Sequence, residues 1–331
     1  MTDVGAGDFA QRLTAACSRH LGGSGKLEGL QRLSGGASQE MWSFDFVKPG
    51  AARLELVLRR NVRSHLQNLP SETEFALLGA ARAGGVPVPT TRFLLEAADE
   101  LGSGYAMDRI EGETIPRKIL RDAEFASALP RMAEQAGRIL AQIHALDVSA
   151  IPGLEAPPSD PAQDAITHLR TLIDQFGEPH PVFELALRWL AEAKPPASRH
   201  ALVHGDFRNG NFMVGPDGIR AVLDWELAHV GDPIEDLGWL CVPSWRFGVV
   251  DKAVGGFGGI EELCAAYTEA GGRGANPERV HYWMVLGTLR WGVICQAQAF
   301  THRSGLTRSV ELAAIGRRVC ETEWDLIDQI G

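Results

Sequence analysis

The sequence predicts an α+β protein built from two lobes: a small β-rich N-terminal lobe with one main helix, and a larger, mainly helical C-terminal lobe. The chain has 331 residues, which is long for a single domain. Period-two alternation of apolar residues dominates up to about residue 110, and helical periodicity dominates after it. We therefore expect lobes at residues 1–110 and 111–331, with a hinge at about 107–112.

The N-terminal lobe begins with an expected short helix over residues 6–21 and continues as strands. The segment LEGLQRLSGGASQEMWSFDF (27–46) is typical of a strand, a glycine-containing turn and a second strand. RLELVLRR (53–60) is a third strand, with Leu54, Leu56 and Leu58 on one face. SETEFALLGAARAGG (71–85) is the main helix, with Ser71 as N-cap and Glu74 completing a capping box. TRFLLEA (91–97) and GYAMDRIEG (104–112) add two strands.

The C-terminal lobe opens with a strongly amphipathic helix over 131–146, followed by a proline-rich loop and helices near 162–175 and 181–194. ALVHGD, NFMVG and IRAVLDWE, between residues 201 and 226, are expected to be short strands around a loop. We expect everything after Asp232 to be helical. The most apolar run, 282–300, carries Arg290 near its middle and is predicted to be a buried helix and not a membrane span.

Composition narrows the function. A net charge of −10 and a pI of about 5.5 argue against nucleic-acid binding, which needs a basic face. This acidity is ordinary for a soluble cytoplasmic protein and would also suit a cationic substrate. The N-terminus has neither a basic region nor an apolar core, so no secretory signal is expected. The five cysteines are scattered without zinc-ligand spacing, which indicates reduced, mostly buried thiols.

The stretch HGDFRNGNFMV (204–214) concentrates short polar side chains beside an apolar strand. Asp206 and Asn211 lie five residues apart, and Asp224 follows at the end of the strand AVLD. Carboxylate and amide oxygens are groups that Mg²⁺ takes together with phosphate oxygens. Two unit charges 4 Å apart near a protein surface repel by about 4 kcal/mol, so a triphosphate beside these carboxylates implies an intervening cation. The alternative is a polar turn joining two strands.

The segments HGDFRNGNFMV and LDWELAHVGDPIEDLGWL resemble the aminoglycoside phosphotransferase-like (choline kinase-like) family, relatives of the protein kinases. Within it the sequence is most similar to the branch that contains kinase domains fused to acyl-CoA dehydrogenases. LSGGASQEMWSF, LVLRR, GVPVP, YAMDRIEGET and the C-terminal segments LGTLRWGVI and ELAAIGRRVCETEWDLI extend the resemblance over most of the chain. The resemblance implies a protein-kinase-like fold, a nucleotide co-substrate, ATP or GTP, and Mg²⁺.

For the nucleotide, the resemblance makes Arg59 the strand residue that contacts the phosphates and Glu74 its ion-pair partner. Arg59 could otherwise be a solvated strand end. Backbone N–H groups of a loop with Gly35, Gly36 and Ser38 would cover the phosphates, although this loop could also be an ordinary hairpin turn. The adenine would pair with the backbone of the linker formed by Met107, Asp108, Arg109 and Ile110.

For the reaction, the resemblance makes Asp206 the group that accepts the acceptor's hydroxyl proton, places Arg208 near the transferred phosphate, and assigns the metal to Asn211 and Asp224. His204 and Asp236 would brace the loop. Locally, Asp232, Pro233 and Glu235 are typical of a helix cap and a capping box.

The acceptor pocket is expected among aromatic side chains of the C-terminal helices, although such a set is more often core packing than a binding site. The six are Trp239, Trp245, Phe247, Tyr282, Trp283 and Trp291. A buried Arg290 needs an anionic partner, which is Asp236, Glu226 or an anionic substrate.

The sequence therefore predicts a kinase that phosphorylates a hydroxyl of a small molecule, with a hydroxyacyl-CoA-like metabolite favoured. An antibiotic kinase is one alternative, and a nucleotide-binding pseudokinase with a regulatory role is an alternative of another class. We expect no nucleic-acid or membrane partner and a cytoplasmic location.

Overall fold

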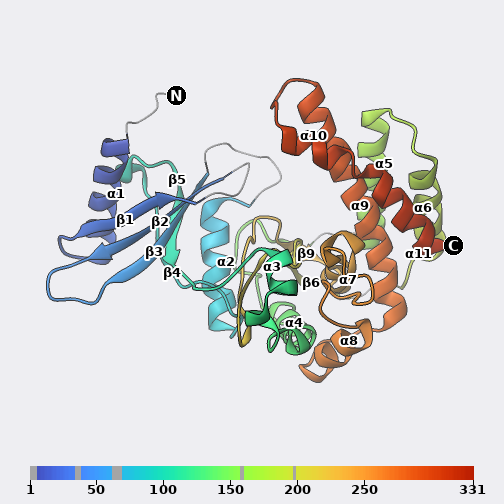
Figure 1. The fold of residues 1–331 in the computed structure, drawn as a ribbon, viewed down its shortest axis with the longest axis horizontal. Coiled ribbons are helices and arrows are strands. Elements are labelled where there is room, and N and C mark those ends of the chain that lie inside the picture. The colour runs from blue at the N-terminus through green and yellow to red at the C-terminus, as the bar shows by residue number, and fades with distance from the viewer. Residues whose placement is uncertain (1–5, 34–38, 62–68, 157–159, 197–198) are drawn as a thin grey trace.

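The computed structural model describes residues 6–33, 39–61, 69–156, 160–196 and 199–331, with a sheet in the first third of the chain and mostly helices beyond it (Figure 1). The strands are β1 (Lys26–Arg32), β2 (Gln39–Val47), β3 (Leu54–Asn61), β4 (Thr91–Leu94), β5 (Ser103–Asp108), β6 (Ala201–Val203), β7 (Phe212–Gly215), β8 (Gly218–Val222) and β9 (His229–Gly231). The helices are α1 (Ala6–Leu21), α2 (Ser71–Ala83), α3 (Pro116–Arg121), α4 (Leu129–Ile143), α5 (Pro161–Phe176), α6 (Pro181–Glu192), α7 (Ile234–Cys241), α8 (Ile260–Glu269), α9 (Pro277–Arg303), α10 (Val310–Gly316) and α11 (Val319–Ile330). Short 3₁₀ helices are η1 (Ala97–Asp99), η2 (Ala123–Phe125) and η3 (Pro243–Arg246). The predicted α+β class is confirmed.

The N-terminal sheet has five antiparallel strands in the order β1-β2-β3-β5-β4. The register places Arg59 of β3 opposite Met41 of β2 and Tyr105 of β5. The side chain of Arg59, in the central strand, therefore has neighbouring strands on both sides.

Each face of this sheet packs against its own helix. The predicted alternation of β3 is confirmed, since Leu56 and Leu58 are buried with Phe44 in a core closed by α1. On the opposite face, Val57 and Met107 join the larger core that continues through α2 into the helical part. One face thus makes a core of its own, and the other is continuous with the rest of the molecule.

The beginning of α2 differs from the prediction. Pro70, and not Ser71, is the N-cap residue, and no side chain caps this helix end. Ser71 is the first helical residue, and its hydroxyl accepts hydrogen bonds from Asn61 and Ser103. Glu74 contacts Arg59 and does not fold back on its own helix. The tertiary ion pair therefore replaces the predicted capping box.

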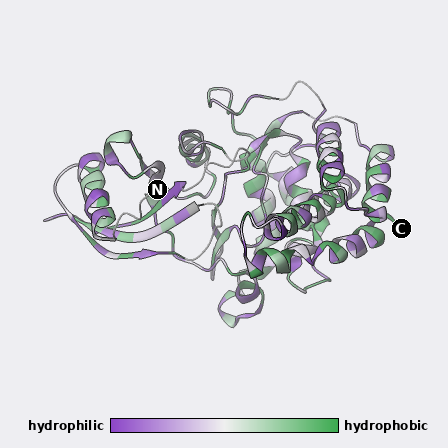
Figure 2. Cartoon of the chain, turned by 90° about the horizontal axis from the view of Figure 1, so that it is seen from above, coloured by the Kyte–Doolittle hydropathy of each residue, from purple (hydrophilic) through white to green (hydrophobic). Residues whose placement is uncertain are grey.

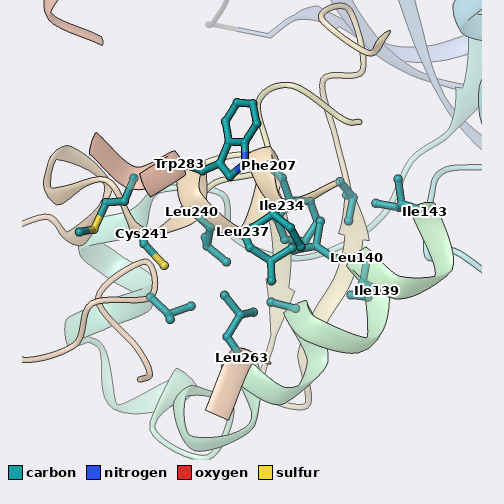
Figure 3. Close-up of a cluster of buried hydrophobic side chains, with 14 of the residues drawn as sticks. Ile139, Leu140, Ile143, Phe207, Ile234, Leu237, Leu240, Cys241, Leu263 and Trp283 are labelled. Carbon is teal, nitrogen blue, oxygen red and sulfur yellow. The ribbon is translucent and has the colours of Figure 1, made fainter. Parts of the chain in front are cut away.

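The helical part is organised around a buried cluster beneath the loop that follows β6. Figure 3 shows side chains of α4 (Ile139, Leu140, Ile143), α7 (Ile234, Leu237, Leu240), α8 (Leu263) and α9 (Trp283) converging with Phe207 of that loop. Helices α4 and α8 pack together, as do α7 and the 27-residue α9. This cluster fixes the floor on which the polar residues of the loop lie.

Two expectations for the C-terminal third were wrong. Strand β9 pairs antiparallel with β6, so a strand precedes α7 where none was predicted. Residues after Asp232 are not all helical, because residues 247–259 form an irregular segment with an isolated bridge between Val254 and Gly258. Glycines cluster there, and three of them (Gly248, Gly255 and Gly256) adopt positive φ. Such residues disfavour continuous helix.

The helices of the C-terminal part carry both hydrophilic and hydrophobic residues along their length (Figure 2). The apolar run 282–300 lies inside α9, as predicted, with most of its side chains buried. Within the described ranges, no helix is long and apolar enough to cross a bilayer.

Candidate active site

The loop after β6 is anchored from below by Asp236 of α7. The backbone N–H groups of His204 and Gly205 donate to its two carboxylate oxygens at 2.8 and 3.0 Å. Gly205 has φ of +80°, and a Cβ there would lie 2.4 Å from the carbonyl oxygen of Leu227. Only glycine fits this turn, which explains the Gly in the HGD motif.

Asp236 is fully buried and is itself held by polar partners. His144 Nε2 lies 3.0 Å from its Oδ2, and His144 Nδ1 lies 2.9 Å from the hydroxyl of Tyr267. Burial by itself would raise the pKa of this carboxyl, but the hydrogen bonds from His144 and His204 hold the pKa of Asp236 below its ordinary value. An ionised carboxylate under the loop fixes two successive backbone N–H groups.

His204 links the loop to the segment that carries Asp224. Its Nε2 lies 3.1 Å from the carbonyl oxygen of Leu223, and its Nδ1 accepts from the backbone N–H of Asp206 at 3.2 Å. Burial lowers the pKa of His204, so the neutral ring serves as donor on one side and acceptor on the other. This is the bracing contact expected from the sequence.

Both carboxylate oxygens of Asp206 are hydrogen-bonded. Oδ1 accepts from Trp239 Nε1 at 2.8 Å and from Arg208 Nε at 2.9 Å. Oδ2 accepts from Asn211 Nδ2 at 2.6 Å. The contact with Trp239 was missed by sequence reasoning, although a signal existed, since Trp239 lies one helical turn after Asp236 and so on the same face of α7.

Arg59 joins the sheet to the helical part. Its buried guanidinium contacts Glu74 of α2 and donates from Nη1 to the Tyr105 hydroxyl at 3.0 Å. Its Nη2 lies 3.3 Å from carboxylate oxygens of both Asp224 and Glu226. The planar guanidinium of arginine carries several N–H donors in a fork, so one side chain can contact several carboxylates at once. A lysine ammonium is a single point charge and lacks this geometry. Arg59 is therefore not the solvated strand end considered as its alternative.

Asp224 occupies a strained backbone position. Its φ is +64°, in the left-handed region, and its side chain is 42 % exposed. The neighbouring Leu223 donates its N–H to the carbonyl of Asn211 at 2.8 Å, so the positions of Asn211 and Asp224 are tied together. Strain at a solvent-facing Asp indicates that its orientation matters for function.

A cavity of about 370 Å³ lies between the sheet and the helical part. Its polar lining includes Arg59, Glu74, Asn211 and Asp224, and its apolar lining includes Met107. Five side chains singled out from the sequence thus meet in one cavity, although up to 165 residues separate them.

The remaining nucleotide candidates do not line this cavity with side chains. The carboxylate of Asp108 accepts two hydrogen bonds from Arg92, at 2.6 and 2.8 Å. The backbone N–H groups of Asp108 and Arg109 donate to the carbonyls of Thr90 and Glu55. Ile110 follows directly, and its N–H carries no hydrogen bond in the described part of the chain. The predicted Gly35, Gly36 and Ser38 lie outside the described residues.

Arg290 has a protein partner, which corrects the sequence hypothesis. Its Nη1 lies 3.0 Å from Glu235 Oε1, and neither Asp236 nor Glu226 is that partner. Glu235 also faces His229 at 3.3 Å and does not complete a capping box. The N-cap residue of α7 is Pro233 and not the predicted Asp232, although Asp232 accepts from the N–H of Ile234 at 2.9 Å. Arg290 therefore gives no support for an anionic substrate.

The six aromatic residues proposed for the acceptor pocket divide into two groups. Tyr282 and Trp283 belong to the main core. Trp239, Trp245, Phe247 and Trp291 form a separate cluster. The guanidinium of Arg208 lies 4.6 Å from the ring centroid of Trp245, and that of Arg290 lies 5.0 Å from that of Trp239. Only the second group therefore adjoins Asp206.

Four of the five cysteines are buried free thiols and Cys320 is exposed. Burial raises the pKa of the Cys17, Cys241 and Cys295 thiols to about 12. Such thiols are not nucleophiles at neutral pH. In the described part of the chain no three His, Cys, Asp or Glu side chains are grouped as a metal site.

The arrangement of sheet, cavity and loop is that of kinase-like small-molecule phosphotransferases. A Ralstonia eutropha structure, provisionally described as an aminoglycoside phosphotransferase, has a TM-score of 0.75 at 23% identity and covers 97% of this chain and 98% of its own. An aminoglycoside phosphotransferase in ternary complex with AMP-PNP and hygromycin B has a TM-score of 0.61 at 16% identity and covers 96% and 97%. At these identities the likeness shows the fold.

Residues 29–280, about three quarters of the chain, match the phosphotransferase enzyme family. The protein belongs to this family. Among curated relatives, acyl-CoA dehydrogenase family member 10 of Mus musculus is 31% identical over 203 residues, which are 57% of this chain and 18% of that protein. Acyl-CoA dehydrogenase family member 11 of Gallus gallus is 26% identical over 249 residues, 68% of this chain and 31% of that protein. The chain thus spans less than a third of the length of either relative. The predicted resemblance to the phosphotransferase family, and within it to kinase domains of acyl-CoA dehydrogenase family members, is confirmed.

Proposed function

We propose that this protein transfers the γ-phosphate of ATP or GTP to a hydroxyl group of a small molecule. The observation that carries the proposal is the meeting of Arg59, Asn211 and Asp224 in one cavity, with Asp206 hydrogen-bonded to Asn211 at its edge. Residues 1–110 form the nucleotide-binding lobe in this proposal, and residues 111–331 supply the catalytic loop and the acceptor site.

The nucleotide occupies the cavity between the lobes. The base lies against Met107, and the N–H of Ile110 is the linker group free to pair with it. Arg59 contacts the phosphates, and Glu74 holds its guanidinium in place. The contacts of Arg59 with Asp224 and Glu226, at 3.3 Å each, are long enough for phosphate oxygens to replace them.

The residues present fit a magnesium ion bound together with the nucleotide. Asn211 uses its Nδ2 group for both hydrogen bonds to Asp206, which leaves its amide oxygen for a cation. Asp224 offers an exposed carboxylate beside it. Magnesium is commonly held by one or two carboxylates plus substrate phosphates, so a group of three acidic or imidazole ligands is not required. When bound, the ion would neutralise the charge of the phosphates between these side chains.

Asp206 orients the acceptor and takes up its proton. The hydroxyl oxygen of the acceptor forms a bond to the γ-phosphorus, the bond from that phosphorus to the β–γ bridging oxygen breaks, and the hydroxyl proton passes to Asp206. Arg208, which now donates to Asp206, lies close enough to turn toward the transferred phosphate. The remaining residues act by positioning, which is the main source of rate in this chemistry.

For the acceptor we propose a hydroxylated metabolite of the hydroxyacyl-CoA type. The likeness to proteins named acyl-CoA dehydrogenase family members 10 and 11 supports it. We propose a cytoplasmic location, and we propose neither nucleic acid nor membrane as a partner.

Thermal shift with ATP and GTP, each with and without Mg²⁺, tests the nucleotide part. We expect nucleotide to raise the melting temperature only with Mg²⁺, and we expect Asp224→Ala to lose this effect. Asp217→Asn, at the exposed turn between β7 and β8, is the matched control and should behave as wild type. Absence of any Mg²⁺-dependent stabilisation by nucleotide would refute the proposal.

Mass spectrometry of a library of hydroxylated metabolites incubated with Mg·ATP tests the transfer. The wild type should add one phosphoryl group to a member of the library, and Asp206→Ala should bind nucleotide without transfer. Nucleotide binding with no product from any hydroxyl compound would identify a pseudokinase instead. Phosphorylation confined to aminoglycosides or macrolides would identify an antibiotic kinase.

A further inference from the structure

A second, larger hollow lies on the helical part, beside the catalytic loop. Its volume is about 1450 Å³, and it is bounded by α3, by η3 with the segment after it, and by α11. In Figure 1, α3 lies in the middle of the molecule, between the sheet and the helices near the C-terminus. We call this hollow the arginine groove because Arg117, Arg121, Arg246 and Arg318 line it.

The arginine groove ends at the catalytic loop. Pro116 lines the groove, and a Cβ built on Gly210 of the loop would lie 3.4 Å from Pro116 Cγ. Ser244 and Arg246 also line the groove, and Trp245 between them carries the guanidinium of Arg208 at 4.6 Å. A molecule lying in the groove therefore has one end beside residues 208–210.

Arg246 is a partly buried cation on which the carboxylates of Asp325 and Asp328 act only at longer range. Its Nε and Nη2 donate to the carbonyl oxygen of Cys241 at 3.3 and 2.9 Å, and Nη2 also approaches the sulfur of Met284. Within the part of the chain that the structure describes, no carboxylate oxygen lies within 4.0 Å of its guanidinium. Burial lowers the pKa of Arg246, as expected for a cation removed from water. A partly buried arginine of this kind is stabilised when a ligand supplies the anion.

Two further cations extend from the same wall. Arg117 and Arg121 lie four residues apart on α3, so they share one face of the helix. Neither makes an ion pair or a side-chain hydrogen bond with any described residue. Like charges at this spacing repel, and an anion between them would remove that cost. Lys118, on another side of α3, is paired with Glu113.

The opposite wall, on α11, carries acidic side chains. Glu321 is paired with Arg318. Asp325 and Asp328 also line the groove, with no cation within 4.0 Å among the described residues, and they act on Arg246 at longer range. An anion in the groove is therefore directed to the α3 and η3 wall and kept away from α11. Counted over its lining, the groove has four arginines against three carboxylates, in a chain of net charge −10.

Apolar side chains stand at the rim of the same groove. Ile115, Val250 and Trp324 are 48 %, 73 % and 75 % exposed. Large apolar side chains exposed together around a hollow are typical of a binding site, whereas single ones are not informative. The groove thus offers cations on one wall and apolar surface at the rim.

We propose that the arginine groove binds the acceptor, and that this acceptor is an amphipathic anion, in which a phosphate-type group is joined to an apolar segment. The inference rests on the proposed function and specifies its substrate class. The anion lies at Arg246, Arg117 and Arg121, the apolar segment lies on the rim, and the acceptor hydroxyl reaches Asp206 past Pro116. A cationic acceptor such as an aminoglycoside does not suit this wall.

Isothermal titration calorimetry with octyl phosphate, below its micelle concentration, tests the groove. We expect binding to the wild type, and at least ten-fold weaker binding to Arg246→Gln and to Arg117→Gln. Arg117 is exposed and unpaired among the described residues, so its variant keeps the fold even if Arg246→Gln does not. Arg138→Gln, on the exposed face of α4 where Arg138 pairs with Glu134, is the matched control and should bind as wild type.

Two matched ligands separate the chemical classes. Octyltrimethylammonium has the same chain with the opposite charge, and binding equal to or tighter than that of octyl phosphate would overturn the proposal. Inorganic phosphate lacks the chain, and an equal affinity for it would overturn the amphipathic assignment. An affinity for octyl phosphate that is unchanged in both arginine variants would overturn the assignment of the binding site to the arginine groove.

The nucleotide separates this inference from the proposed function. Octyl phosphate should bind with the same affinity in the presence of saturating Mg·AMP-PNP, because the groove and the nucleotide cavity are different sites. Displacement by the nucleotide would place octyl phosphate in the nucleotide cavity and refute the groove. A wild type that binds octyl phosphate but no nucleotide would refute the kinase proposal and leave the anion site in place.

Discussion

The ion-pair cluster of Arg59 makes a strong prediction about stability. Arg59→Met keeps an unbranched side chain in the central strand but removes the guanidinium. Glu74 then remains as an almost fully buried carboxylate, 2 % exposed, without its cation. Breaking a buried ion pair on one side costs about 3–5 kcal/mol, because the desolvated charge is left uncompensated.

The expected loss of stability can be divided among the three carboxylates that Arg59 contacts. Asp224 and Glu226 are 42 % and 19 % exposed, so water can compensate them in part. Glu74 cannot gain water without opening α2 from β3. We therefore assign most of the loss to Glu74, and we expect Arg59→Met/Glu74→Leu to recover at least half of it, since replacing both partners removes the buried charge.

Differential scanning calorimetry measures this effect. In a chain of this size about 1 kcal/mol shifts the melting temperature by roughly 2 °C, so Arg59→Met should lower it by about 6–10 °C. Arg53→Met is the matched control, because Arg53 is 51 % exposed and its pairs with Glu28 and Asp45 are screened by water. A single variant as stable as the control, or a double variant less stable than the single, would show that the cluster is not a desolvated charge network.

Three further predictions concern individual side chains. Trp239→Phe removes the indole N–H that donates to Asp206, and should lower kcat by about ten-fold at unchanged nucleotide affinity. Trp283→Phe is the control, because the indole N–H of Trp283 has no hydrogen-bond partner among the described residues, and steady-state kinetics giving equal kcat for both variants would contradict the assignment. Burial raises the pKa of Asp325 from 3.8 to about 6, so the folded state binds more protons than the unfolded state between these values and stability falls as pH rises through them. Asp325→Asn should therefore stabilise the protein at pH 7.5 by about 1–2 kcal/mol, which allows for solvent screening of an upper limit of about 3 kcal/mol. Below pH 4 the variant should bring no gain in stability. A gain that is independent of pH in thermal melts would show that the buried charge of Asp325 is not its cause. Asp224 has φ of +64°, so Asp224→Asn should keep the stability of the wild type, while Asp224→Ala should lower the free energy of unfolding by about 1 kcal/mol. Both variants should lose Mg²⁺-dependent nucleotide binding. Thermal melts that give equal stability for the two variants would exclude backbone strain at this residue.

Local patterns were sufficient for most elements of the fold. The alternation of Leu54, Leu56 and Leu58 correctly gave the buried face of β3, because side chains two apart in a strand share a face. HGDFRNGNFMV and LDWE predicted Asp206, Asn211 and Asp224 as site residues, and the structure brings them close together, since Asn211 is hydrogen-bonded to Asp206 and lines one cavity with Asp224. The predicted partner of Arg59 was Glu74, and the structure pairs them.

Local patterns failed where two solutions used the same residues. SETE satisfies the pattern of a capping box, yet the Glu74 carboxylate contacts Arg59. A charge-assisted contact with a buried guanidinium is stronger than the single hydrogen bond from a backbone N–H that a capping box would give. The glycine-rich segment after η3 fell within the region after Asp232 that was expected to be helical, but its positive-φ glycines permit the chain to turn.

The sequence by itself determined the type of lobes, the family and the catalytic loop, since these depend on periodicity and on a short run of residues. Only the tertiary structure decided which charges meet. Glu235 and Asp236 are adjacent, but successive helical residues point about 100° apart, so Asp236 lies beneath the loop while Glu235 faces α9 and pairs with Arg290. The rule that a buried arginine needs an anion was applied to Arg290, which has Glu235 as its partner. Packing instead leaves the partly buried Arg246 with no carboxylate within 4.0 Å among the described residues.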